Sequence, residues 1–301
     1  MMMNIDRKPE TLDEAIAQSA FYARNAIELF SPKHVVTMVS GGNDSAACHH
    51  LAIELGLPVT MTIHGRTGCG LQGTTDFVAA NYGTDAPLEI ADAGKAYEEY
   101  VMRKGFFGKG VDAHGFAYRI LKAGPFRKLV SASLRKGKTG VRVMMLNGAF
   151  AAESANRKAN LKRGRIDPGA QGNMWFNLIH DWTPEIRDEY LLTRGVKLNP
   201  VAQALCRSGE CMCGTMQTDA ERIEAAAFDP AWGRWLTELD NAVIEKHGYG
   251  WGKPAPNVNK NRPDLFMPMC VDCGQDHRPP DGRFISTNKI GDSPRLIHPI
   301  S

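Results

Sequence analysis

The sequence lacks any apolar run long enough to cross a membrane, and its N-terminal segment has no apolar stretch of the signal-peptide kind. Asp6, Arg7, Lys8 and Glu10 stand where that stretch would lie. Charges of the two signs nearly balance, since the formal net charge is only +3 at pH 7. So small a net charge does not by itself indicate a nucleic-acid partner. We therefore expect a cytoplasmic protein with no membrane partner.

Cysteine is uncommon and odd in number, with seven residues in a chain of 301. An odd count argues against the disulfide framework of a secreted protein. Five of the seven are clustered instead, with Cys206, Cys211 and Cys213 in C-R-S-G-E-C-M-C-G and Cys270 and Cys273 in C-V-D-C-G. In a reducing compartment, this clustering indicates metal binding or redox chemistry.

The sequence also lacks the G-x-x-x-x-G-K-[ST] pattern of the Walker phosphate loop, but a different glycine turn stands in a comparable place. The apolar run Val35–Val39 predicts a buried strand, and Ala46–Leu55 has helical spacing. Between them, Ser40-Gly41-Gly42-Asn43-Asp44-Ser45 brings backbone N–H groups and a helix N-terminus to one point. This arrangement predicts an anion site, and phosphate is the usual anion.

Each residue type in this loop has a physical use at a phosphate site. The glycines Gly41 and Gly42 let the backbone approach the ligand, and Ser40 and Ser45 supply hydroxyl donors. Asp44 would repel a bare phosphate, so we expect it to hold a Mg2+ ion that bridges phosphate oxygens.

Further strands and helices alternate along the chain. Strands are predicted at Pro58–His64, near Leu88–Ala91 and at Val141–Leu146, with a helix over about Thr74–Tyr82. This alternation predicts an α/β fold with a parallel sheet and right-handed crossovers. We expect three parts: an N-terminal helix packed on the core (1–33), a nucleotide-binding α/β domain (34–200), and a cysteine-bearing helical or irregular region (201–301).

Residues 97–135 are predicted to be largely helical, with breaks at Gly105–Gly110 and at Gly124-Pro125. Basic residues gather in Arg127–Lys138 and again in the loop Lys158–Arg165. Such runs are usually a solvated helix face, which is the interpretation we favour, although they also allow a nucleic-acid acceptor.

Capping signals predict three more helices. Thr183 followed by Pro184 is expected to begin one helix, and Thr218 with Glu221 a second. Asp229-Pro230 is expected to begin the third.

Two predicted strands end where a ligand would lie in an open α/β sheet. One ends at His64, before a loop that carries Cys69, and the other ends just before Asn147-Gly148. Glu153 and Arg157 follow at helical spacing, and Arg157 is a candidate clamp for phosphate or another oxyanion. The alternative is a surface salt bridge between Glu153 and Arg157.

Four separated motifs resemble those of one superfamily. S-G-G-N-D-S at residues 40–45 resembles the loop of the PP-loop ATP pyrophosphatases, the adenine nucleotide alpha-hydrolase-like superfamily. G-A-F-A-A-E-S-A-N-R at 148–157 resembles the strand–G-x-x-x-x-E-S-x-x-R segment of its phosphoadenosine phosphosulfate (PAPS) reductase branch, although the arginine usual after the glycine is absent. W-T-P-E-I at 182–186 and N-P-V at 199–201 resemble later motifs of that family. The resemblance covers roughly Val35 to Met216.

The resemblance implies a Rossmann-like fold and an enzyme that splits ATP into AMP and pyrophosphate while adenylating an acceptor. It implies that Ser40–Ser45, His64, Gly148 and Glu153 bind the nucleotide. Asp44, Ser45 and Arg157 are then expected to be catalytic. The pattern is most similar to the DNA phosphorothioation sulfurtransferase branch, for which a cysteine desulfurase is a candidate sulfur donor.

The resemblance also bears on the cysteines. Several family members hold a 4Fe-4S cluster directly after the N-P motif, which implies that four of the five clustered cysteines bind such a cluster. A zinc site would use the same ligands and is the alternative. Cys48 is expected to be a small buried hydrophobe, and Cys69 a packed loop cysteine rather than a sulfur carrier.

Two alternatives to ATP cleavage stay open. A PAPS or adenylylsulfate reductase would reduce the sulfate of its nucleotide, but this chain keeps a complete S-G-G-x-D-S loop and lacks the E-C-G-[IL]-H and Cys-Cys motifs of those enzymes. A non-catalytic ATP-sensing subunit would bind ATP in the same loop without turnover. The complete loop favours ATP cleavage, with sulfur transfer to the adenylated acceptor.

Overall fold

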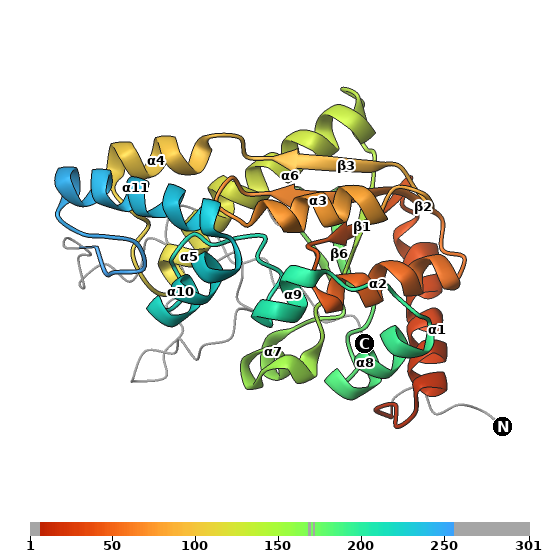
Figure 1. Ribbon diagram of the computed structural model, residues 1–301. Coiled ribbons are helices and arrows are strands. Elements are labelled where there is room, and N and C mark those ends of the chain that lie inside the picture. Colours follow the sequence, from red (N-terminus) through yellow and green to blue (C-terminus); the bar gives the residue numbers. More distant parts are fainter. Residues whose placement is uncertain (1–6, 168–169, 171, 256–301) are drawn as a thin grey trace, which may run out of the picture.

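The computed structural model describes residues 7–167, 170 and 172–255. Its centre is a six-stranded sheet in the order β3-β2-β1-β4-β6-β5. The strands are β1 (His34–Val39), β2 (Val59–Arg66), β3 (Leu88–Asp92), β4 (Val143–Asn147), β5 (Gly164–Ile166) and β6 (Asn173–Asn177). Neighbouring strands are parallel except for β5, which runs antiparallel to β6. The predicted α/β fold is confirmed (Figure 1).

Helices connect the strands and extend the chain beyond the sheet. The α-helices are α1 (Leu12–Phe30), α2 (Asn43–Glu54), α3 (Gln72–Asn81), α4 (Ala96–Lys104), α5 (Val111–Tyr118), α6 (Gly124–Leu129), α7 (Ala155–Asn160), α8 (Pro184–Thr193), α9 (Pro200–Leu205), α10 (Asp219–Phe228) and α11 (Pro230–His247). Two π-helical turns, η1 (Arg119–Ala123) and η2 (Val130–Arg135), and one 3-10 turn, η3 (Ala151–Glu153), complete this list for the described residues.

Alternate residues of the central strands enter two different apolar cores. Val35 of β1 and Met144 of β4 pack with α1, α2 and α8 on one face of the sheet. Val36 and Met145 pack with α6 and η2 on the other face. Successive side chains of a strand point to opposite faces, so a strand covered on both sides is apolar throughout. Helices therefore cover both faces of the sheet.

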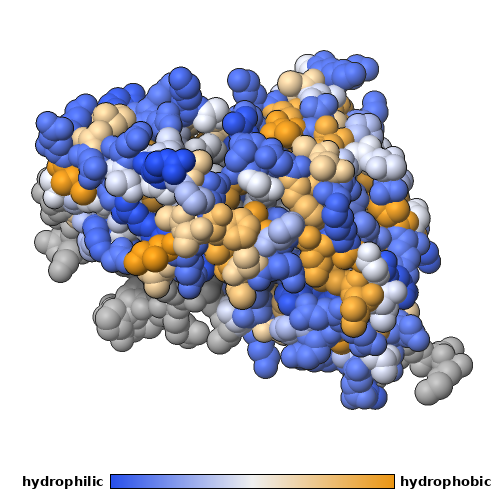
Figure 2. Space-filling model, in the orientation of Figure 1, coloured by the Kyte–Doolittle hydropathy of each residue, from blue (hydrophilic) through white to orange (hydrophobic). Residues whose placement is uncertain are grey.

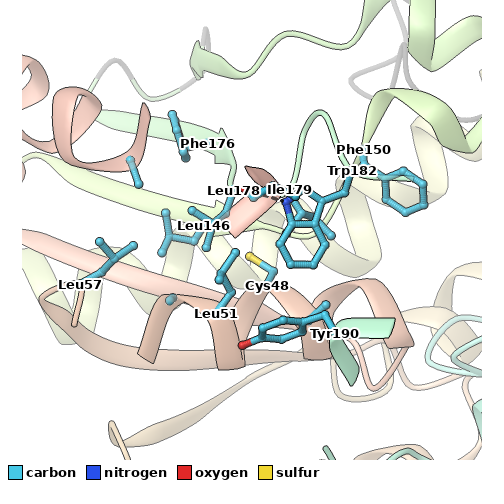
Figure 3. Close-up of a cluster of buried hydrophobic side chains, with 14 of the residues drawn as sticks. Cys48, Leu51, Leu57, Leu146, Phe150, Phe176, Leu178, Ile179, Trp182 and Tyr190 are labelled. Atoms are coloured by element: carbon cyan, nitrogen blue, oxygen red, sulfur yellow. Dashed lines mark hydrogen bonds between the residues drawn. The ribbon is translucent and has the colours of Figure 1, made fainter. Parts of the chain in front are cut away.

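The first of these cores contains Cys48. Its thiol is fully buried and lies between Leu51 and Trp182 (Figure 3). Burial raises the pKa of the Cys48 thiol far above its usual value. The prediction that Cys48 is a small buried hydrophobe is confirmed.

A second group of helices lies beyond one end of the strands. α4, α5, α10 and α11 lie together at the left of Figure 1. They share an apolar cluster with α9 that includes Tyr97, Trp232 and Trp251. Cys69 from the β2–α3 loop and Cys213 belong to the same cluster, so it joins the cysteine segment to the edge of the sheet.

The predicted capping signals begin helices as expected. Thr183 accepts a hydrogen bond from the Ile186 amide at the start of α8, with Pro184 at the first helical position. Thr218 and Glu221 form a complete capping box on α10.

The predicted break at Gly124-Pro125 is wrong. The chain stays helical from α5 to η2, because the π turn η1 directly precedes Gly124-Pro125. The Gly124 amide bonds to the Arg119 carbonyl five residues back, in place of the α-helical partner. A proline has no N–H and its ring crowds the carbonyl four residues earlier. The wider π turn makes room for the ring without ending the helix.

The structure adds two strands that the sequence analysis did not predict. β5 overlaps the end of the expected basic loop, and β6 lies between β4 and β5 in the sheet. Both strands are short, and β6 has an asparagine at each end, Asn173 and Asn177. Neither strand therefore has a long apolar run of the kind by which β1 was found.

The surface in Figure 2 is largely polar, and separate apolar areas lie between the charged side chains. Leu29 of α1 and Leu192 of α8 are the most exposed of the large apolar residues that the structure describes. None of the described helices combines the length and the apolar character that crossing a membrane requires.

Candidate functional site

The S-G-G-N-D-S loop connects β1 to α2 and is held in shape by its own hydrogen bonds. The Ser45 hydroxyl donates to the Gly42 carbonyl (2.8 Å) and accepts from the Ser40 amide (3.1 Å). Gly41 has φ +79, a conformation that favours glycine, and a Cβ there would lie 2.7 Å from a methyl of Thr74. The loop is therefore preorganised, with the N-terminus of α2 at its end.

Asn199 of the N-P segment fixes the loop from outside. Its side-chain amide donates to the Gly41 carbonyl (3.0 Å) and to the Thr74 hydroxyl (3.2 Å). Asn199 is 2% exposed, so these hydrogen bonds are shielded from water. The N-P motif thus supports the loop physically, a role that the sequence pattern alone did not reveal.

A pocket of about 330 Å³ opens at this loop, at the carboxyl ends of β1, β2 and β4. Five of the predicted site residues line it: Ser40, Asp44, Ser45, Gly148 and Arg157. Apolar and aromatic side chains form other parts of the wall, including Ile63, Phe126 and Trp175. A polar, helix-capped end and a partly aromatic wall together suit a ligand with an anionic group and a flat ring.

Gly148 is in close contact with the first turn of α2. A Cβ at this position would lie 2.8 Å from the Ser45 amide nitrogen and would clash with the Asp44 carbonyl. Beside it, Asn147 donates to Asn177 (3.1 Å), which ties the ends of β4 and β6 together. Glycine is therefore required here by the approach of two backbones.

His64 is not brought to the pocket lining. Ile63 and Gly65 line the pocket, and the side chain between them lies on the opposite face of β2. Both ring nitrogens of His64 are engaged, one with the Val39 carbonyl (2.8 Å) and one with the Thr75 hydroxyl (3.1 Å). His64 thus connects the end of β1 to α3.

Glu153 and Arg157 form an ion pair at the N-terminus of α7. Ser154 caps this helix by accepting a hydrogen bond from the Arg157 amide (3.1 Å). Arg157 also lines the pocket, and its side chain is 19% exposed. The salt bridge that the sequence left as an alternative is present, and it places the guanidinium beside the pocket.

Asp44 forms an ion pair that the sequence analysis missed. An Nη of Arg187, on α8, lies 2.5 Å from the Asp44 carboxylate. Burial alone would lower the pKa of Arg187, but the hydrogen bond and charge of Asp44 outweigh it and raise the pKa. The two residues are 143 positions apart, so no local pattern could have paired them.

A second ion pair, between Lys122 of η1 and Glu210, lies in the pocket wall. The two groups are 3.0 Å apart, and the Glu210 side chain is only 6% exposed. Burial would lower the pKa of Lys122, but the charge of Glu210 outweighs this effect and raises it. Sequence reasoning missed both residues, because Lys122 lies in an ordinary helical run and Glu210 among cysteines.

Three cysteines, Cys69, Cys211 and Cys213, share one apolar cluster next to this ion pair. Cys211 is hydrogen-bonded to the thiols of both Cys213 and Cys69, and Cys69 and Cys213 are buried. The hydrogen bonds from Cys213 and Cys69 lower the pKa of Cys211 well below its usual value. Cys206 is instead exposed at the end of α9.

The predicted metal ligands Cys270 and Cys273 lie outside the described residues. Among the residues that are described, no three His, Cys, Asp or Glu side chains are arranged to hold a metal ion. An iron–sulfur or zinc centre therefore does not fit the described cysteines alone, and it stays a prediction.

Three solved structures are similar to the chain. PAPS reductase from Candida auris, in a phosphate complex, is 14% identical over 64% of this chain and 89% of that chain, with a TM-score of 0.43. NMN synthetase from Francisella tularensis is 14% identical over 80% of this chain and 96% of that chain, with a TM-score of 0.47. NAD+ synthetase from Burkholderia pseudomallei is 13% identical over 80% of this chain and 92% of that chain, with a TM-score of 0.43. No match was found among curated proteins. The family model of the phosphoadenosine phosphosulfate reductase domain matches residues 34–216, more than half of the chain, and the chain therefore belongs to that family.

Proposed function

We propose that the protein binds ATP in the pocket at the S-G-G-N-D-S loop and cleaves it to AMP and pyrophosphate, adenylating an acceptor. One observation carries the proposal. The loop, the N-terminus of α2 and the side chains of Asp44 and Arg157 all face one pocket. A triphosphate needs this combination of backbone donors, a cation-holding carboxylate and an arginine.

The loop is proposed to hold the β and γ phosphates. Backbone N–H groups at the start of α2 have no partner within the helix, and the helix dipole favours an anion there. The hydroxyls of Ser40 and Ser45 lie 3.1 Å apart at the same end of the pocket. In the reaction, the nucleophile of the acceptor attacks the α phosphorus, the bond to the bridging oxygen breaks, and pyrophosphate leaves with the electron pair.

Asp44 fits a Mg2+ ion that enters with the nucleotide. Mg2+ is usually held by one or two carboxylates together with substrate phosphates. The Asp44 side chain is 34% exposed and lines the pocket next to the loop. When bound, the ion would neutralise charge on the phosphates, and Arg157 would bind the oxygens of the departing group.

Sulfur transfer to the adenylated acceptor extends the proposal, and Cys211 supports it. Cys211 directly follows the pocket residue Glu210, and its lowered pKa favours the thiolate, which is the nucleophilic form. The thiolate would attack the outer sulfur of a persulfide donor, so that a new S–S bond forms while the donor's thiolate leaves.

Reduction of PAPS is the second candidate function. It is favoured by the family of the chain and by the same cysteine, because a thiolate is the nucleophile that such a reduction requires. In this case, the loop would bind the phosphates of the product nucleotide rather than a departing pyrophosphate.

One set of assays separates the candidates. Given ATP, Mg2+ and a nucleic-acid acceptor, the wild-type protein is expected to release pyrophosphate. The Asp44→Asn variant is expected to release it at least about 100-fold more slowly. Sulfite release from PAPS with a thiol reductant would instead establish the reductase. If calorimetry showed that ATP binds, but no pyrophosphate was released with DNA or RNA acceptors present, the protein would be an ATP sensor.

A further inference from the structure

Arg187 uses its guanidinium to join two carboxylates. One Nη contacts Asp44 at 2.5 Å, while Nε and the other Nη contact Asp188 at 2.9 and 2.8 Å. The Arg187 side chain is 18% exposed, and its guanidinium lies 5.8 Å from the ring centre of Phe150. This cation is therefore held against Asp44 from several directions.

The helices that carry the pair are also tied together at their other ends. Glu54, in the last turn of α2, accepts a hydrogen bond from the Tyr190 hydroxyl (2.8 Å) and forms an ion pair with Arg194 (2.9 Å). Tyr190 lies on α8, and Arg194 directly follows the last residue of that helix. Arg187 thus stands on a helix that is fixed relative to the loop, and it does not need to move to reach Asp44.

The pairing occupies only one carboxylate oxygen. Arg187 contacts Oδ1 of Asp44, and within the described part of the chain no hydrogen bond or ion pair reaches Oδ2. Asp44, which lines the pocket, therefore has one carboxylate oxygen available, and its charge is already compensated. A divalent cation approaching Oδ2 would meet a fixed positive charge just behind the carboxylate.

We propose that Arg187 makes the cation site of Asp44 conditional on nucleotide. The inference rests on the proposed function. Without phosphate, repulsion from the guanidinium keeps a divalent cation off the single carboxylate. When a polyphosphate enters, its negative charge would outweigh that repulsion, and Asp44 would then hold the cation together with the nucleotide. Metal then enters only together with its nucleotide.

The test measures binding of Mn2+ alone, as a paramagnetic substitute for Mg2+, by electron paramagnetic resonance of the free ion. The wild-type protein is expected to bind Mn2+ weakly without nucleotide. Arg187→Gln removes the compensating charge and is expected to bind Mn2+ at least about tenfold more tightly. Arg187→Lys keeps the charge and is expected to behave like the wild type.

Two further variants make the result specific. Arg194→Gln breaks the ion pair between Arg194 and Glu54 and is expected to leave Mn2+ affinity unchanged, which separates the charge of Arg187 from the packing of α8 on α2. The double variant Asp44→Asn, Arg187→Gln is expected to lose the added affinity. If the double variant still bound Mn2+ more tightly than the wild type, the ion would be assigned to Asp188 and the proposal would be overturned. Equal Mn2+ affinity in the wild type and in Arg187→Gln would also overturn it. Wild-type protein that binds no ATP would defeat the proposed function but would leave the Mn2+ comparison interpretable.

Discussion

The α carbon of Gly148 faces the backbone between Asp44 and Ser45 so closely that a methyl group there would lie 2.8 Å from the Ser45 amide nitrogen. The end of β4 therefore forms part of the surface against which the first turn of α2 is set. We expect Gly148→Ala to displace this turn and to weaken ATP binding at least about tenfold, with a loss of about 1–3 kcal/mol in unfolding free energy. Calorimetry and urea denaturation measure the two effects.

Gly73→Ala is the matched control. Gly73 lies in α3, outside the pocket, and an added Cβ would come no closer than 3.4 Å to Val201. Its unfolding free energy is expected to stay within about 1 kcal/mol of the wild type, because alanine suits a helix better than glycine. Unchanged ATP affinity in Gly148→Ala would show that the approach of the two backbones does not shape the site.

The buried ion pair between Lys122 and Glu210 is expected to be sensitive to the loss of either partner, because the remaining charge would be buried without a counter-ion. Lys122→Met leaves the Glu210 carboxylate, 6% exposed, without its counter-ion, and we expect a loss of about 3–5 kcal/mol in unfolding free energy. The double variant with Glu210→Gln removes the stranded charge and is expected to recover most of the loss. Urea denaturation of the three proteins makes the comparison.

The exposed pair of Arg66 and Asp92 provides the contrast for this experiment. Its side chains are 48% and 40% exposed, so Arg66→Gln is expected to cost less than about 1 kcal/mol. If Lys122→Met cost no more than Arg66→Gln, the buried pair would not have the assigned importance.

His49 is expected to make the folded state sensitive to mild acid. Burial, with the charge of His50, lowers the pKa of His49 from 6.5 to about 4. As the pH falls from about 6.5 to 4, the unfolded chain takes up a proton that the folded chain does not. The contribution of neutral His49 to the free energy of unfolding is therefore fully present above about pH 6.5. It falls by as much as about 3 kcal/mol as the pH is lowered to about 4.

His49→Gln removes this proton while keeping a polar partner for the Thr37 hydroxyl, which lies 2.9 Å from the ring. Urea denaturation at several pH values is expected to give a smaller loss of stability on the acid side than in the wild type. The remaining slope contains the effect of His50, whose pKa burial also lowers. Parallel curves for the two proteins would contradict the assignment.

Cys211 is expected to react as a thiolate at neutral pH. Iodoacetamide should label Cys211 below about pH 7, whereas the buried Cys48 should stay unlabelled until the protein unfolds. Cys213→Ala removes the hydrogen bond that most lowers the pKa of Cys211, and labelling of Cys211 should then shift to higher pH. Mass spectrometry of the labelled peptides gives the pH profile of each cysteine. Labelling of wild-type Cys211 only above about pH 8.5 would contradict the prediction.

The parts of the site that could be predicted are those encoded in contiguous residues. The S-G-G-N-D-S loop could be predicted because strand, turn and helix follow one another within about twenty residues. The fold could be predicted from the alternation of such units along the chain. Gly148 and Arg157 could be placed because they follow a strand whose carboxyl end had to face the same crevice.

The parts that could not be predicted depend on contacts between distant segments. Arg187 meets Asp44 across 143 positions, and Lys122 meets Glu210 across 88. Cys69 joins Cys211 only because the β2–α3 loop packs on the segment after α9, where the Thr67 hydroxyl donates to the Glu210 carbonyl (2.7 Å). A charged residue in a helix carries no signal of such a partner, since most helical charges are simply solvated.

The extra residue in the π turn η1 determines which side chains of the following helix face the pocket. Tyr118, Lys122 and Phe126 all line the pocket and stand before, within and after this turn. Deleting one residue from Arg119–Ala123 would allow ordinary α-helical bonding but would rotate the following segment by about 100°. Phe126 would then turn away from the pocket, and the ring of Pro125 would lose the room that the π turn provides. In relatives of this protein, a single-residue gap at this point would therefore mark a change in both the pocket and the helix.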